Sequence, residues 1–209
     1  MVHFRRREPA LVRTNAQVRR PTTDLKSTSV GHFCVQCGAP LVIKVIEGRE
    51  LEACPNDDFI LWRDPKVAAA VVVVADGGIA LGRRGIEPGY GLWCLPGGFV
   101  NDDESPTDAA VRECREEIGA AVDIEGVLDV YHGAKTNASS IVVIAYRGRL
   151  LDGEELAPGD EMLEVGVFPL NALPELAFPS HRQALAKYRA ELASPPSPAP
   201  AEPRRSRRR

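Results

Sequence analysis

Residues 97–119, "GGFVNDDESPTDAAVRECREEIG", place two glycines and an acid-rich loop before a helix-forming segment. Ser105 is a favourable N-cap and Pro106 suits the first helical position. Asp108 is favoured near the positive end of the helix dipole. We therefore predict a helix that begins after Ser105 and ends just before Gly119.

Three glutamates share one side of this predicted helix. At about 100° per residue, Glu113, Glu116 and Glu117 fall within an arc of about 100°. Like charges at this spacing repel one another unless a cation lies among them. Clustered carboxylate oxygens suit Mg²⁺ or Mn²⁺. The alternative is a solvated acidic helix. The apolar stripe that would anchor the helix consists of Val111, Cys114 and Ile118.

The wider pattern resembles the signature of the Nudix hydrolases. Gly98 is followed after five residues by Glu104, and after seven more by "RECREEIGA", from Arg112 to Ala120. At about 7% per residue type, seven fixed letters at fixed spacing coincide in on the order of one in 10⁸ windows. The flanking segments "GLWCLPGGFV" and "EMLEVGVFPLNALPELAF" are also similar to this family, so the resemblance covers about residues 64–192.

The resemblance implies an α/β (α+β) fold, a Nudix α/β/α sandwich in which a mixed β-sheet lies between helices. It also implies a hydrolase that cleaves the diphosphate bond of a nucleoside diphosphate linked to a further group. Metal ions would bridge the pyrophosphate oxygens and activate a water. Because this chemistry needs no covalent enzyme intermediate, we expect Cys94 and Cys114 to be buried small residues.

The resemblance assigns roles to residues of the box itself. Glu113, Glu116 and Glu117 would bind the catalytic Mg²⁺ or Mn²⁺, helped by the backbone carbonyl of Gly97. Arg112 would pair with a glutamate and hold it in place, since at i,i+4 it faces Glu116.

Residues around the box receive supporting roles. Glu104 would lie behind the ligands, and Gly98 and Gly119 would serve the backbone turns. Members of the family often take a further metal ligand or general base from a loop beyond the box. Glu161 and Glu164 compete for that part, and we prefer Glu164 because it directly precedes a predicted strand.

The segments around the box predict the rest of the domain. "KVAAAVVVVADGGIALGRR" predicts a buried strand, an Asp-Gly-Gly turn and a second strand, and "VLDVY", "IVVIAYRGRL" and "EVGVFPL" predict further strands. A last helix is predicted over "SHRQALAKYRAEL", with Ser180 and Gln183 as a capping box.

Residues 29–63 form a short unit that is too small to hold a core without a staple. "CVQCG" supplies Cys34 and Cys37, and "CPNDD" supplies Cys54, with Asp57 at the interval where a zinc ribbon has its fourth cysteine. The unit therefore predicts a structural Zn²⁺ site, or a ribbon that has lost its metal. The candidates for the fourth ligand are Asp57, Asp58 and His32.

The net charge of −3 conceals basic ends. Residues 1–30 hold seven Arg and Lys against two acids, and residues 194–209 hold five Arg against one acid, which leaves −12 for residues 31–193. We predict a disordered basic arm at 1–28 and a disordered Pro/Arg-rich tail at 193–209. Basic ends can bind nucleic acid, but solvated ends are the favoured interpretation.

The apolar content gives no sign of a membrane protein. The longest apolar run, from Val67 to Val74, is far shorter than the roughly 18 residues of a membrane span. Without an evident secretory signal, the five cysteines suit the reducing cytoplasm.

A ribbon ahead of a Nudix domain resembles two branches, the NADH pyrophosphatases and a group acting on ADP-ribose or FAD. The second is closer, because "IEPGYGLWCLPGGFV" and "LAFPSHRQAL" are similar to its segments. The main hypothesis is a Mg²⁺-dependent pyrophosphohydrolase of such dinucleotides. A nucleotide-sensing or nucleic-acid-binding regulator and an RNA 5′-end pyrophosphohydrolase are the alternatives.

Related folds make a homodimer the expected assembly. Trp93, Tyr90 and Phe178 could stack an adenine or pack the core.

Overall fold

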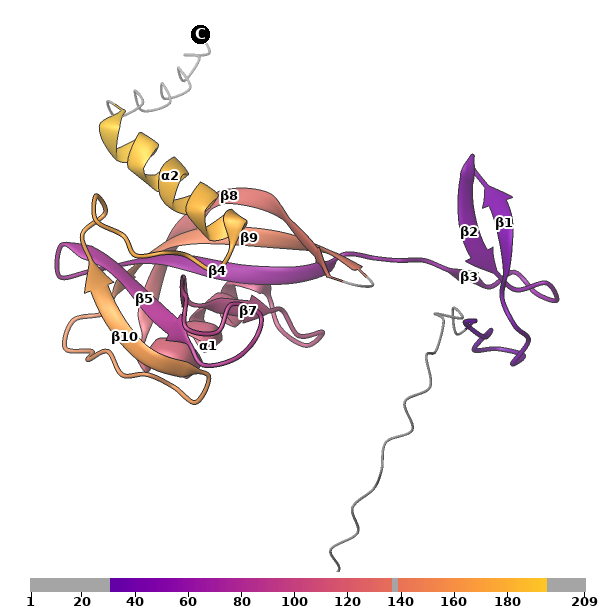
Figure 1. Cartoon of the computed structure of the whole chain (residues 1–209), viewed down its shortest axis with the longest axis horizontal. Coiled ribbons are helices and arrows are strands. Elements are labelled where there is room, and N and C mark those ends of the chain that lie inside the picture. The colour runs from indigo at the N-terminus through magenta and orange to yellow at the C-terminus, as the bar shows by residue number, and fades with distance from the viewer. Residues whose placement is uncertain (1–30, 137–138, 195–209) are drawn as a thin grey trace, which may run out of the picture. The chain divides into compact units, whose positions relative to one another are not determined.

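The computed structural model describes residues 31–136 and 139–194 (Figure 1). The predicted basic arm at 1–28 lies outside the described residues, as does the predicted tail at 193–209 apart from its first two positions. The chain divides after Trp62 into two compact units.

The first unit is a small antiparallel sheet. Its strands are β1 (Val42–Ile46), β2 (Arg49–Ala53) and β3 (Ile60–Leu61), in the order β1-β2-β3. Ile46 pairs with Arg49 across a two-residue turn of Glu47 and Gly48, both at positive φ. Within its described part the buried residues are Cys34, Ala53 and Cys54. Packing of apolar side chains therefore contributes little to holding this unit together.

The second unit contains a seven-stranded mixed sheet. Its strands are β4 (Lys66–Ala75), β5 (Gly78–Arg84), β6 (Trp93–Cys94), β7 (Gly97–Phe99), β8 (Val122–Thr136), β9 (Ser139–Leu150) and β10 (Met162–Phe168). The main order is β10-β5-β4-β9-β8, with β6 against β5 and β7 against β4. β4 and β9 run parallel and the other pairs run antiparallel. The predicted mixed sheet is confirmed.

Strand β4 is the centre of the sandwich, because it is buried on both faces. Side chains alternate along a strand. Val71 and Val73 therefore join the cluster beneath α1 (Pro106–Ile118), whereas Val72 joins the cluster beneath α2 (Pro179–Ala193). The continuous apolar run of this strand is typical of a strand covered on both sides. The two helices thus cover opposite faces of the sheet, as the α/β/α prediction requires (Figure 1).

Alanines line the contact between α1 and the sheet. Ala69 of β4 and Ala109 and Ala110 of α1 are at most 1% exposed and belong to one cluster. Because a methyl group occupies little volume, helix and strand approach closely here.

The predicted turn after β4 is confirmed. Ala75 pairs with Gly78, and Asp76 and Gly77 between them have φ angles of 45° and 75°. Two successive residues at positive φ match the twist of a two-residue hairpin, which explains the Asp-Gly pair.

The predicted cap of the last helix is wrong. Phe178 is the N-cap and makes no side-chain capping bond, while Ser180 lies inside α2 and is buried. Pro179 begins the helix, since its fixed φ suits the first helical position. Neither helix among the described residues has the length and apolar character needed to cross a bilayer.

Candidate active site

Helix α1 carries the site, and its ends are fixed by local contacts. The Ser105 hydroxyl accepts a hydrogen bond from the Asp108 N–H at 3.1 Å, and Asp108 Oδ2 accepts one from the Ser105 N–H at 3.4 Å. Gly119 ends the helix with φ 71° in the left-handed region. The predicted start and end of this helix are confirmed.

The three glutamates of the box differ in burial. Glu117 is buried, the Glu113 side chain is 14% exposed and the Glu116 side chain is 56% exposed. Glu117 Oε2 accepts a hydrogen bond from the Gly97 N–H at 2.8 Å. The acidic face therefore extends from the interior of the domain to its surface. The contribution of the Gly97 carbonyl to metal binding stays a prediction.

Burial raises the pKa of two of these carboxyl groups. It raises the pKa of Glu117 to about 8, against the opposing effect of the Gly97 N–H. Burial is also the main cause of the raised pKa of Glu113, which the neighbouring Arg112 opposes. The contacts from Arg112 and the Gly97 N–H therefore do not fully offset the cost of burying Glu113 and Glu117 in their ionised forms. A bound divalent cation would supply the missing positive charge, so the donor set fits Mg²⁺ or Mn²⁺.

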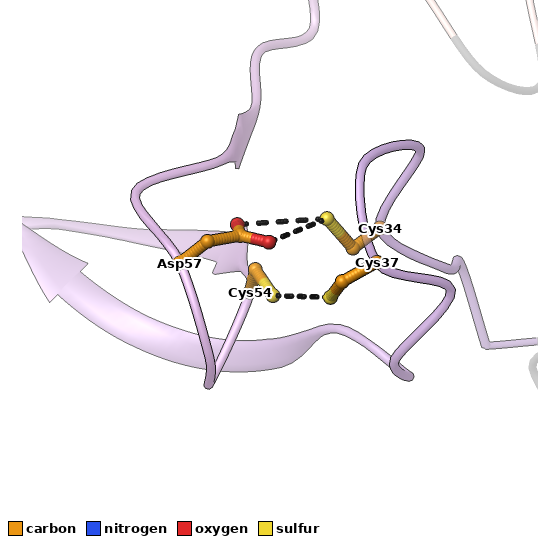
Figure 2. A group of neighbouring side chains, drawn as sticks. All are labelled: Cys34, Cys37, Cys54 and Asp57. Carbon is orange, nitrogen blue, oxygen red and sulfur yellow. Dashed lines mark hydrogen bonds between the residues drawn. The ribbon is translucent and has the colours of Figure 1, made fainter.

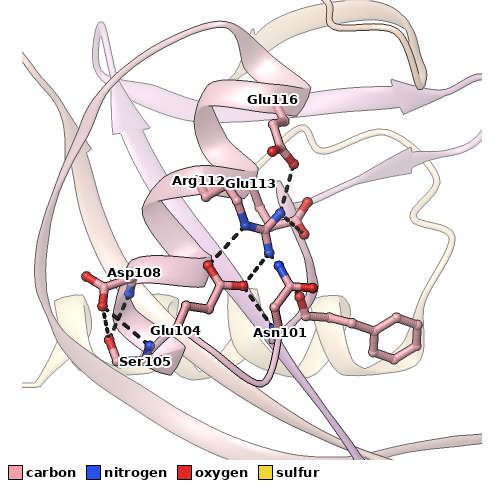
Figure 3. Close-up of polar contacts among 8 residues, drawn as sticks. Asn101, Glu104, Ser105, Asp108, Arg112, Glu113 and Glu116 are labelled. Atoms are coloured by element: carbon pink, nitrogen blue, oxygen red, sulfur yellow. Dashed lines mark hydrogen bonds and ion pairs between the residues drawn. The ribbon is translucent and has the colours of Figure 1, made fainter.

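Arg112 joins two of the box glutamates, Glu113 and Glu116, into one network (Figure 3). Its Nη1 donates to Glu113 Oε1 and to Glu116 Oε2, both at 2.8 Å. Its Nη2 donates to the backbone carbonyl of Phe99 at 3.0 Å. The predicted i,i+4 contact with Glu116 is therefore present, and the same guanidinium also ties the helix to the end of β7.

Glu104 holds Arg112 from the other side (Figure 3). Its two carboxylate oxygens accept from Arg112 Nη2 at 2.7 Å and from Nε at 3.0 Å, a bidentate pair. The Asn101 N–H also donates to Glu104 Oε1 at 2.9 Å. These bonds, that of Arg112 first, lower the pKa of Glu104 to about 2. Glu104 thus remains ionised and orients the guanidinium, which agrees with its predicted place behind the ligands.

The loop that precedes β10 closes over the C-terminal end of α1. The Ala157 N–H donates to the Ile118 carbonyl at 3.0 Å, and the Gly159 N–H donates to the Glu117 carbonyl at 3.1 Å. Carbonyls at a helix end lack partners within the helix, and this loop supplies them. The same loop brings Glu161 close enough for its charge to raise the pKa of Glu113 and Glu117 as a minor cause.

Glu164, the preferred carboxylate beyond the box, is engaged elsewhere. Its Oε2 accepts from Arg83 Nη1 at 3.3 Å, and its side chain is 55% exposed. Arg83 lies opposite Glu164 in the pairing of β5 with β10. This placement favours Glu161 over Glu164 as the additional carboxylate of the site.

Arg84 is a residue of the site that the sequence did not single out. It is 7% exposed, its Nε donates to the Pro88 carbonyl at 2.7 Å, and its guanidinium lies 5.0 Å from the centre of the Phe178 ring. Its charge lowers the pKa of Glu117 as a minor cause. The burial of Arg84 could not be predicted from the sequence, because it follows Arg83 at the end of a strand, where a charged side chain is usually exposed.

His181 is buried beside Arg84. Its Nδ1 accepts a hydrogen bond from the Leu95 N–H at 3.0 Å. Burial, together with the nearby Arg84 charge, lowers the pKa of His181 to about 3. This histidine is therefore a neutral part of the core.

The three aromatic candidates for stacking an adenine have different surroundings. Trp93 packs edge-on against Phe168, with ring centres 4.6 Å apart. Phe178 lies edge-on to His181 at 5.0 Å. Tyr90 is 59% exposed. Packing accounts for the first two rings, and Tyr90 is the ring with a free face.

The cysteines of the second unit are core residues. Cys94 and Cys114 are both at most 1% exposed. Burial raises the pKa of Cys94 to about 12 and that of Cys114 still further. Both are neutral thiols at physiological pH, which confirms the prediction that they are buried small residues.

In the first unit the structure brings four predicted ligands together. Ligand atoms of Cys34, Cys37, Cys54 and Asp57 all lie within 4.8 Å of one another (Figure 2). The alternative ligand His32 instead bonds Glu52, with its Nδ1 at 2.9 Å from Oε1.

Comparisons with known proteins agree on the second unit. The family model described as the NUDIX domain matches residues 64–188. An ADP-ribose pyrophosphatase of Methanocaldococcus jannaschii is 33% identical over 145 residues, 69% of this chain and 82% of the relative. A NUDIX hydrolase structure from Nitrosomonas europaea has a TM-score of 0.66 and 32% identity, over 76% of this chain and 90% of that one. An ADP-ribose pyrophosphatase structure from Streptococcus suis has a TM-score of 0.50 and 27% identity, over 61% of this chain and 92% of that one.

Proposed function

The chain belongs to the NUDIX hydrolase family, and on this premise we propose that it is a Mg²⁺- or Mn²⁺-dependent pyrophosphohydrolase. Its substrate is a nucleoside diphosphate linked to a further group, such as ADP-ribose, FAD or an NADH-like dinucleotide. The observation that carries the proposal is the burial of Glu117 on the acidic face of α1. Burial raises the pKa of this carboxyl group to about 8, and a bound cation would stabilise its ionised form. An acidic helix that is merely solvated would not bury its carboxylate in this way.

Residues of α1 would hold the metal. Glu113, Glu116 and Glu117 are the carboxylates we assign to it, with the Gly97 carbonyl as a further oxygen. When bound, the cation would neutralise charge on the pyrophosphate and lower the pKa of a coordinated water. Arg112 and Glu104 are positioning residues, because they fix the carboxylates through the bonds described above and need not touch the substrate.

The reaction consumes one water and forms two monophosphates. The water oxygen bonds to one phosphorus as the bridging P–O bond breaks, and the released phosphate leaves with the bridging oxygen. We propose that Glu161 accepts the proton of the attacking water. Glu161 lies in the loop before β10, close enough for its charge to raise the pKa of Glu113 and Glu117. A carboxylate of this kind acts as a general base.

The substrate class is supported by two observations. Two of the similar proteins, one curated relative and one solved structure, are named ADP-ribose pyrophosphatases. In this chain Tyr90 is an exposed ring in the loop between β5 and β6, available to stack an adenine. Trp93 packs against Phe168 and Phe178 packs against His181, so we do not assign these two rings to the substrate.

A panel of substrates tests the proposal. ADP-ribose, FAD, NADH and 5′-triphosphorylated RNA would be incubated with the full chain and Mg²⁺, and monophosphate products measured by chromatography. We expect turnover of ADP-ribose, FAD or NADH, and loss of that turnover in Glu116→Gln. Turnover of RNA alone, abolished by truncation to residues 29–193, would favour the RNA 5′-end alternative instead. No turnover in any case would reject the enzyme.

A further inference from the structure

Four side chains of the first unit, those of Cys34, Cys37, Cys54 and Asp57, point toward one another (Figure 2). Cys34 Sγ lies 3.3 Å from Asp57 Oδ2, and Cys37 Sγ lies 3.4 Å from Cys54 Sγ. With Zn–S bonds of about 2.3 Å and a Zn–O bond of about 2.1 Å, tetrahedral ligands stand about 3.6–3.8 Å apart. These two pairs therefore need to separate by only a few tenths of an ångström to admit Zn²⁺, and all four ligand atoms lie within 4.8 Å of one another.

Backbone hydrogen bonds to sulfur form a matching pair on the two loops. The Gln36 N–H donates to Cys34 Sγ and the Asn56 N–H donates to Cys54 Sγ, each at 3.4 Å. In both loops the donor stands two residues after the cysteine. The backbone of each loop thus fixes the position of its own cysteine sulfur.

The surroundings select Asp57 among the three candidates for the fourth ligand. The Phe59 N–H donates to Asp57 Oδ1 at 2.9 Å and fixes the carboxylate beside the sulfurs. His32 Nδ1 is occupied by Glu52, and Asp58 is exposed and lies outside the group. From this geometry we propose that the unit binds one Zn²⁺ through Cys34, Cys37, Cys54 and Asp57.

Soft sulfur ligands decide the identity of the metal. Three thiolates and one oxygen in a tetrahedron suit Zn²⁺, whereas Mg²⁺ requires an octahedron of oxygens. A disulfide between Cys37 and Cys54 would use only half of the group. It would also leave the Cys34 thiol facing the Asp57 carboxylate without a cation.

The metal holds the unit folded. Its described part buries Cys34, Ala53 and Cys54, while Ile43 and Val45 of β1 are more than 60% exposed. A unit with so little buried apolar surface gains its stability from the metal, so the free energy of binding becomes free energy of folding. This inference does not depend on the hydrolase activity of the second unit.

The test uses the full chain, reduced and reconstituted with Zn²⁺ or Co²⁺. Zn²⁺ content is measured by mass spectrometry, and Co²⁺ binding by its thiolate-to-metal charge-transfer absorption. This absorption reports on sulfur ligands and is blind to a metal held by the box glutamates. We expect one Zn²⁺ per chain, and affinity weakened by more than about 100-fold in Cys37→Ser, since loss of a mere supporting contact already costs 10–100-fold.

The matched pair Asp57→Asn and Asp58→Asn identifies the fourth ligand. Asp57→Asn should weaken Co²⁺ affinity by about 10–100-fold, Asp58→Asn should leave it within about twofold, and Asp57→Cys should strengthen both affinity and absorption. Chelation should open residues 31–62 to protease while the second unit resists. Equal affinities for the two asparagine variants, less than half an equivalent of Zn²⁺, or a Cys37–Cys54 disulfide that protects the chelated unit would overturn the proposal.

Discussion

Replacing Gly98 with alanine should disable the site while sparing the fold. A Cβ on residue 98 would lie 2.6 Å from Cδ and 2.8 Å from Oε2 of Glu113, whereas ordinary contacts begin at 3.4 Å. The Oε1 atom of Glu113 would lie closer still, so its carboxylate must retreat by about 1 Å to restore an ordinary contact. A misplacement of about 1 Å costs on the order of 10²-fold in rate. We expect kcat/KM to fall about 100-fold, which corresponds to about 2.7 kcal/mol of transition-state stabilisation.

Stability should respond much less, because the clash is with the end of a flexible side chain. The free energy of unfolding of Gly98→Ala should stay within about 1 kcal/mol of the wild type. Gly97→Ala is the opposite control. A Cβ there would lie 2.6 Å from the backbone Cα of Ala70, which cannot move aside, so this variant should lose stability. Urea unfolding and dinucleotide turnover, measured on both proteins, separate the two effects.

A double-mutant cycle isolates the cause of the lost activity. In a Glu113→Ala background the space beside residue 98 is already clear, so adding Gly98→Ala should cost less than about threefold more activity. Two outcomes would refute the reasoning. One is a Gly98→Ala enzyme with activity within threefold of the wild type, and the other is an equal loss with and without the Glu113 side chain.

Three further changes probe the same domain. Arg112→Lys should lower kcat about 10–100-fold with little change in KM, because a lysine ammonium cannot make the bidentate pair with Glu104 and bond Glu113 and Glu116 at the same time; steady-state kinetics checks this. Glu161→Gln should lower kcat by about 10²-fold or more, and the exposed Glu164→Gln should stay within about twofold; the reverse order would restore Glu164 as the functional carboxylate. His181 has a folded pKa of about 3, below its ordinary 6.5, so the unfolded state binds the extra proton between these values. Stability should be full above pH 6.5 and fall by about 1.4 kcal/mol per pH unit below it. His181→Asn keeps an acceptor for the Leu95 N–H, and urea unfolding at several pH values should show a shallower fall than in the wild type.

The parts of the fold that the sequence predicts correctly are set by neighbours in the chain. The Ser105 cap and the Gly119 end of α1 each depend on contacts or conformations within a few residues. The Asp76-Gly77 turn likewise needs only two residues that tolerate positive φ. The spacing of the box glutamates is a local property of the helix, which is why the acidic face could be predicted before the sheet was known.

The incorrect or incomplete predictions concern residues whose role depends on distant contacts. The sequence favours Glu164 over Glu161 because Glu164 adjoins a predicted strand, whereas the docking of the Gly159 loop on the end of α1 depends on distant contacts, and the choice between the two stays a prediction. The capping box at Ser180 matches a local pattern, yet the N-cap is Phe178, two residues earlier, and Ser180 is buried inside the helix. Arg84 became part of the site because the chain around Pro88 folds back over it.

The proposed metal site of the first unit shows the same division. The cysteine spacing predicts two sulfur-bearing loops, since each loop is a short local structure. The choice among the three candidates for the fourth ligand needed the pairing of His32 with Glu52, twenty residues away.

The alanines beneath α1 determine where its carboxylates stand. Because Ala69, Ala109 and Ala110 are methyl-sized and fully packed, one additional carbon at any of them would lift the helix as a rigid body. All three box glutamates would then shift together. The distances among them would stay the same, while their distance from the backbone of Gly97 would increase. The preference of the site for cations of larger radius could therefore be altered without changing any glutamate of the box. The positions to substitute would be the three alanines, which pack in the core between α1 and β4.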